Sequence, residues 1–266
     1  MKQTFKTFIV VLMLFLAFGC GPSQREMAVQ QINRAKQSLL VNDTLLAISQ
    51  LDSVHLKYPK AEVQKVVARN IQAELYRDLT DQALNEQTQN DSLIAKLEKK
   101  FVKQKTEFDQ YTQYIPKRQS FNRSWDRSFL QINLDERGEL YLTSNYMGKE
   151  WLDHTGIRVY DGKLQAKSGK VPLDDPLNHR SDFLDYKWEK VSYMNGKSDS
   201  VINFIAEHPK LDLKCVFLGK RYYYILLEDY DIQAVIDALE LSKAIKRKKL
   251  IADEIKKYRN KTSQLQ

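Results

Sequence analysis

The sequence predicts an α+β fold: an N-terminal helical hairpin region, an antiparallel β-sandwich or curled sheet, and a long C-terminal helix. Apolar residues recur at helical spacing over the first half of the mature chain, which indicates amphipathic helices. Short alternating runs separated by turn residues follow between 120 and 228, and they favour an antiparallel sheet. Helical spacing returns from about residue 231.

The first 19 residues are predicted to be a cleaved signal peptide. Lys2 and Lys6 precede an unbroken apolar run from Phe8 to Phe18, and a small residue, Gly19, stands before Cys20. A basic start, a short apolar core and a small residue before the cut describe a secretory signal. A helix that spans a bilayer needs about 20 apolar residues, so we do not expect this run to remain as an anchor.

The segment Leu16-Ala17-Phe18-Gly19-Cys20 resembles a bacterial lipobox. The resemblance implies that Cys20 is acylated and becomes the first residue of the mature protein, which ties it to a lipid bilayer. Gly21 stands where an Asp would imply retention in the inner membrane, so the resemblance implies an outer-membrane anchor facing the periplasm. Exposure on the cell surface is the alternative location. The alternative is an ordinary cleaved signal with a Cys20 present by chance.

Residues 20–116 are predicted to be helical. Ser23 and Glu26 fit a capping box at the start of a first helix, and Pro59 closes a second. The spacing of small residues, turn and closing Pro resembles one tetratricopeptide helix pair; a plain hairpin is the alternative. The residues that carry the resemblance are Ala35, Asn42, Asp43, Thr44, Ala47, Leu51, Val54 and Pro59.

Two further helices are predicted before the β region. One runs from Ala61 to about Leu84, and polar residues from Asn85 to Asn90 separate it from the next. The next, 91–115, carries a heptad seam that we expect to pack within the same chain rather than on a second copy. The seam consists of Ile94, Leu97, Phe101, Gln104, Phe108, Tyr111 and Ile115, and Pro116 ends the helix.

The segment 120–228 is predicted to form the antiparallel β domain. Asn195-Gly196 is the strongest hairpin signal, with strands expected before it and at Val201 to Ile205. Cys215 lies on the same alternating face as Leu213 and Phe217, so we expect a buried, inert thiol.

A long basic helix is predicted over 231–262, with the helix over 91–115 as its expected partner. A helix of this length needs such a partner for stability. Its basic residues are candidates for contact with anionic lipid headgroups, and a solvated face is the alternative. The candidate membrane-surface residues are Lys246, Arg247, Lys248 and Lys249.

No catalytic constellation stands out in the sequence. The four histidines have no metal-binding spacing, and no nucleophile elbow or phosphate loop is present, so we expect no enzyme activity, no metal and no cofactor. The acidic stretch from Asp174 to Asp185 leaves open an envelope hydrolase with an unrecognised site.

Aromatic residues crowd the β region and could stack on sugars or anchor a protein interface. The candidate ligand-contacting residues are Trp125, Trp151, Trp188 and Tyr223, and a place in the core is the alternative for each. In a strand, the run Tyr222-Tyr223-Tyr224 must present at least one ring on the outer face.

The formal net charge of +8 over 266 residues does not point to nucleic acid, because a secreted chain meets none. We therefore expect a membrane-anchored, non-catalytic scaffold or protein-interaction module of the cell envelope with a protein partner. A glycan-binding β-sandwich lipoprotein is the alternative.

Overall fold

The computed structural model describes residues 22–105, 107, 110–120 and 127–266. The chain divides into a smaller unit, 1–85 with 253–266, and a larger unit, 86–252. The predicted signal peptide and Cys20 lie outside the described residues, and so does Trp125.

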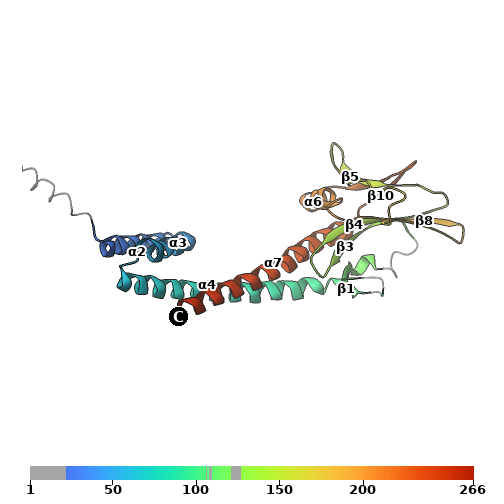
Figure 1. The fold of residues 1–266 in the computed structure, drawn as a ribbon. Helices are drawn as coiled ribbons and strands as arrows, with labels where there is room; N and C mark the ends of the chain where they lie inside the picture. The colour runs from blue at the N-terminus through green and yellow to red at the C-terminus, as the bar shows by residue number, and fades with distance from the viewer. Residues whose placement is uncertain (1–21, 106, 108–109, 121–126) are drawn as a thin grey trace, which may run out of the picture. The chain divides into compact units, whose positions relative to one another are not determined.

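The smaller unit contains the predicted helical hairpin. Helices α2 (Gln24–Leu40) and α3 (Thr44–Lys57) lie side by side (Figure 1). The capping box is confirmed, because the Glu26 amide donates to the Ser23 hydroxyl and the Ser23 amide donates to the Glu26 carboxylate. Ala28, Ala35 and Ala47 are fully buried, so small residues allow the two helices to approach closely.

Helix α4 (Glu62–Glu98) runs without interruption through the polar stretch at which a break was expected. The expected break was wrong because these polar side chains have partners on the C-terminal helix α7 (Asp229–Leu265). Glu86 pairs with Arg247, and the Asn90 amide donates to the Ala244 carbonyl. No Pro or Gly interrupts the helix there. The contacts with α7 can therefore keep the polar stretch helical.

The helix predicted over 91–115 was wrong beyond Glu98. Strands β1 (Phe101–Gln104) and β2 (Gln113–Pro116) pair antiparallel, from Phe101 opposite Pro116 to Gln104 opposite Gln113. Phe101 and Ile115 are buried, and the Phe101 ring meets Tyr114 edge-on at 6.4 Å. Burial in a sheet therefore outweighs a local heptad spacing, and the β domain begins at 101 rather than 120.

In the described part of the chain, ten antiparallel strands form two sheets, which confirms the α+β class. One sheet has the order β1-β2-β3-β4-β8-β7 and the other β10-β9-β5-β6. The remaining strands are β3 (Phe129–Asp135), β4 (Leu140–Gly148), β5 (Gly156–Asp161), β6 (Leu164–Lys167), β7 (Asn178–Phe183), β8 (Tyr186–Tyr193), β9 (Lys214–Leu218) and β10 (Tyr222–Leu226).

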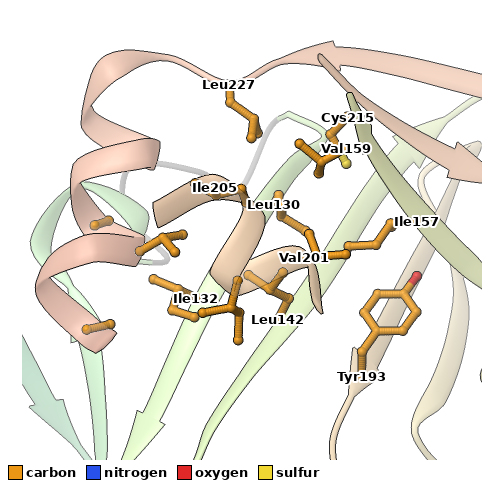
Figure 2. Close-up of a cluster of buried hydrophobic side chains, with 14 of the residues drawn as sticks. Leu130, Ile132, Leu142, Ile157, Val159, Tyr193, Val201, Ile205, Cys215 and Leu227 are labelled. Atoms are coloured by element: carbon orange, nitrogen blue, oxygen red, sulfur yellow. The ribbon is translucent and has the colours of Figure 1, made fainter. Parts of the chain in front are cut away.

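The two sheets share one core. Figure 2 shows Ile132 and Leu142 of the six-stranded sheet in the same cluster as Val159 and Cys215 of the four-stranded sheet. All four side chains are fully buried. This common core corresponds to the predicted sandwich.

The predicted hairpin at Asn195-Gly196 and the strand at Val201 to Ile205 were both wrong. Both turn residues have positive φ, as the dipeptide predicts, but β8 leads through the turn into helix α6 (Asp199–Glu207). The apolar run is so short that its spacing fits both a helix and a strand. As a helix it buries Val201 and Ile205 in the core.

Helix α7 confirms the long C-terminal helix, but its partner is α4 and not a separate helix over 91–115. In the larger unit, Arg247 pairs with Glu86 and Lys248 with Asp91. In the smaller unit, the rings of Tyr76 and Tyr258 lie 6.2 Å apart. In the part of the chain that the structure describes, no helix combines the length and apolar character needed to cross a bilayer.

Candidate functional site

A buried polar network lies between the two sheets. Ser144 on β4 shares the inward face of its strand with Leu142, and Glu189 and Tyr193 share the inward face of β8. His154, in the segment between β4 and β5, completes the network. Strand alternation thus directs side chains that lie far apart in sequence toward one place.

The contacts follow the order of a Ser–His–carboxylate triad. His154 Nε2 lies 2.7 Å from Ser144 Oγ, and His154 Nδ1 lies 2.6 Å from a Glu189 oxygen. The Tyr193 hydroxyl lies 2.9 Å from Ser144 Oγ. An ionised carboxylate can only accept, so His154 donates from Nδ1, and in the neutral ring Nε2 accepts from the Ser144 hydroxyl. These residue types in this order can carry out acyl transfer where a substrate reaches the serine.

In the conformation seen here, burial keeps a substrate from reaching Ser144. Ser144, His154 and Tyr193 have no exposed surface, and Glu189 is 1% exposed. The His154 ring is stacked on Phe217 of the opposite sheet with ring centroids 5.1 Å apart. Because the serine lies inside a closed core on an internal strand, the network functions here as internal structure, with each member hydrogen-bonded.

Glu189 also holds the segment that carries His154. Its carboxylate accepts the backbone amides of Leu152, Asp153 and His154 at 2.6, 2.8 and 3.1 Å. Burial by itself would raise the pKa of Glu189. The hydrogen bonds from the His154 ring and from the amides outweigh burial, and the pKa lies below its ordinary value.

This lowered pKa predicts a loss of stability in acid. A carboxylate whose pKa is lower in the folded state stabilises the fold above its unfolded pKa of about 4.3 and loses that contribution as pH falls through the folded value. We expect the difference in unfolding free energy between the natural chain and Glu189→Gln to shrink below about pH 4.3. Urea denaturation at pH 7, 5, 4 and 3 measures it, and a difference that stays constant across this range would contradict the assignment.

Burial also affects two weakly acidic groups, Tyr193 within the network and Cys215 in the same core. Burial raises the pKa of the Tyr193 hydroxyl and of the Cys215 thiol far above their ordinary values. Cys215 is free and fully buried, which confirms the expected buried thiol, and a protonated thiol of this kind is a poor nucleophile.

The described aromatic candidates do not form one platform. Trp151 lies beside Arg180 and Lys187, whose cationic groups stand 5.6 and 5.5 Å from its ring. Trp188 alternates with Glu189 and so lies on the outer face of the six-stranded sheet. Tyr223 packs inward, edge-on to Tyr146 at 5.1 Å.

The neighbours of Tyr223 are exposed instead. Tyr222 and Tyr224 are 60% and 56% exposed, which confirms that the tyrosine run presents rings outward. Strand alternation decides which of the three residues faces solvent, and Tyr223 takes the core position that was its alternative.

Three of the four basic candidates on α7 form ion pairs within the chain. Lys246 pairs with Glu139 at 3.0 Å, Arg247 makes a forked contact with Glu86 at 2.6 and 2.7 Å, and Lys248 pairs with Asp91 at 2.9 Å. The Arg247 contact lowers the pKa of Glu86. Lys249 is exposed. Three of the four candidates therefore have acidic partners on α4 or in the β domain.

The acidic stretch from Asp174 to Asp185 has local structural roles. Asp175 accepts the Leu177 amide, and Asp182 pairs with Lys187. Among the described residues, no group of His, Cys, Asp and Glu side chains could hold a metal ion.

A cleft of about 440 Å³ opens between the start of β4, the turn before α6, and α7. Its lining carries both signs of charge, and Arg137 and Lys246 are already paired with Asp135 and Glu139. The cleft therefore offers no concentrated charge for one class of ligand.

The smaller unit exposes apolar side chains at the turn between α2 and α3. We call this group the turn surface: Leu40, Val41, Leu45 and Leu46, which are 84%, 74%, 77% and 46% exposed. The spacing of apolar residues in the sequence does not distinguish these four residues from core residues. Exposed apolar groups of this kind mark sites of interaction with proteins or membranes.

The comparisons with known proteins give no relative. No family model, curated protein or solved structure matches the chain. The candidate sites therefore depend on the geometry of this chain alone.

Proposed function

We propose that the protein is a membrane-anchored lipoprotein of the cell envelope that acts as a non-catalytic scaffold or protein-interaction module. The observation that carries the proposal is the turn surface, four large apolar side chains turned to solvent in seven residues of sequence. Large apolar side chains are unfavourable in water, and a protein partner would cover these four.

The position of the turn surface agrees with an anchored protein. Only Gly21, Pro22 and Ser23 separate Cys20 from α2, so an acylated Cys20 would keep the helical unit near a bilayer. α2 has 17 residues and is about 25 Å long, which separates the turn surface from the anchored end. A partner in the same membrane could then reach it.

The anchor is tested by Cys20→Ser. Because acyl chains each contribute about 0.8 kcal/mol per buried CH₂, their loss should release the protein from membranes. We expect the natural chain in the membrane fraction and Cys20→Ser in the soluble fraction or unprocessed. Unchanged processing and fractionation of Cys20→Ser would contradict the lipoprotein part of the proposal.

The partner is tested by affinity capture from solubilised membranes. Leu40→Ser/Leu45→Ser should lose a protein that the natural chain recovers, whereas Lys36→Ser/Lys57→Ser, altered at exposed polar positions of the same helices, should retain it. Both double variants change exposed residues, so folding should be unaffected. Identical recovery by both variants, or recovery of glycan alone, would contradict the interaction role.

A further inference from the structure

The edge strand β10 differs from the other three edges of the two sheets. β1 contains Lys103, β6 contains Lys167, and β7 contains Arg180 and Asp182, whereas all five residues of β10 are uncharged. Edge strands normally carry charge or Pro, because their unpaired backbone groups recruit other strands. β10 lacks that protection.

The backbone of β10 presents hydrogen-bonding groups at alternate residues. The Leu227 amide donates to the Leu213 carbonyl of the neighbouring segment, so Leu227, Ile225 and Tyr223 direct their groups toward β9. By the same alternation, Tyr222, Tyr224 and Leu226 direct theirs away from the sheet, and among the described residues β10 pairs with β9 alone.

The same three residues carry the exposed side chains. Tyr222, Tyr224 and Leu226 are 60%, 56% and 66% exposed and share the outer face of the sheet. Donors, acceptors and apolar surface that need a partner therefore coincide on one strand.

The charges at the two ends of β10 indicate what that partner is. Lys220 precedes the strand and Glu228 follows it, with side chains 78% and 59% exposed. If two β10 strands pair antiparallel about Tyr224, each Tyr222 lies opposite Leu226, and each Lys220 lies opposite Glu228. Within one chain, Lys220 already contacts Asp153, and Glu228 already contacts Arg127. A Lys220–Glu228 pair between two copies would add to these ion pairs.

We propose that β10 binds a second copy of this chain by antiparallel β10–β10 pairing centred on Tyr224, which joins the two four-stranded sheets into one. The contact is isologous, because the same strand serves both partners. Tyr224 of each copy exchanges two backbone hydrogen bonds with its equivalent. Further backbone hydrogen bonds form between Tyr222 of one copy and Leu226 of the other. This proposal is independent of lipidation and of the turn surface.

Cysteine cross-linking in whole cells that produce the full chain tests the register, whether or not the chain is membrane-bound. In a hydrogen-bonded pair the two Cα atoms are about 5.5 Å apart, within the range that a disulfide spans. Tyr224→Cys should give a disulfide-linked dimer upon oxidation, whereas the natural chain and Lys167→Cys, on the opposite edge, should not. Tyr222→Cys and Leu226→Cys should each remain uncross-linked alone and form a dimer when produced together.

A second measurement distinguishes pairing from misfolding. The mass of the full chain in detergent should be twice that of one copy by light scattering, and Tyr224→Lys should reduce it to one copy with an unchanged circular dichroism spectrum. A monomeric natural chain without a Tyr224→Cys dimer would overturn the proposal. Cross-linking of Tyr224→Cys to a different protein, or of Lys167→Cys to itself, would do so as well.

Discussion

Glu189→Ala should destabilise the protein by about 3–5 kcal/mol, the cost typical of removing one partner from a buried charged network. The substitution leaves three backbone amides and the His154 ring without their acceptor inside a closed core. Each buried donor left unpaired costs about 1–3 kcal/mol, although such costs are not additive. Urea denaturation at pH 7 measures the change through the unfolding midpoint.

Two variants calibrate that expectation. Glu150→Ala removes a 70% exposed carboxylate that pairs with Arg221, and it should change stability by less than about 0.5 kcal/mol. Glu189→Gln keeps an oxygen acceptor but directs an amide group at other donors, so its effect should fall between the two. If Glu189→Ala matched Glu150→Ala, the carboxylate would not be holding the segment from Leu152 to His154.

Gly219→Ala should cost about 3 kcal/mol, at the upper end of the usual range for overpacking. Gly219 lies in the turn between β9 and β10, against the same segment that Glu189 holds. A Cβ atom at this position would stand 2.2 Å from the Leu152 carbonyl oxygen and 3.0 Å from the His154 backbone nitrogen. Backbone atoms cannot rotate aside as a side chain can, so the turn or the segment must shift.

Gly162→Ala is the matched control. Gly162 also lies in a hairpin turn, but a Cβ there meets no atom within 4 Å, and only its φ of +54° opposes the substitution. That backbone conformation costs an L-residue about 1 kcal/mol. Thermal unfolding of both variants should place Gly219→Ala clearly lower, and equal midpoints would show that the close approach to Leu152 is absent in solution.

The spacing of apolar residues predicted correctly those helices that pack against elements close in sequence. Ala28, Ile32 and Ala35 recur at helical spacing and are buried, because α2 and α3 pack against each other directly. The same reasoning failed at Phe101 and at Val201. Their apolar spacing fits more than one period, and strands and helices distant in sequence decide between the outcomes.

The sites were harder to predict than the fold. Ser144, His154 and Glu189 form no motif, since they come from two strands and a connecting segment that meet only in the folded sandwich. A serine on the apolar face of β4 was the one available signal. The exposure of Leu45 could not be predicted either, because an apolar residue at the start of a helix is equally compatible with the core.

The segment from Leu152 to His154 is held from both sheets, by Glu189 of β8 and by the turn at Gly219. An early intermediate with only the six-stranded sheet formed would leave the inner face of that sheet open to water, and the Glu189 carboxylate would hydrogen-bond to water instead of to the segment. One with only the four-stranded sheet would leave the segment without its acceptor. Neither layer alone gains the stabilisation of these hydrogen bonds, so we expect the β domain to form in a single cooperative step that waits for contacts more than 30 residues apart.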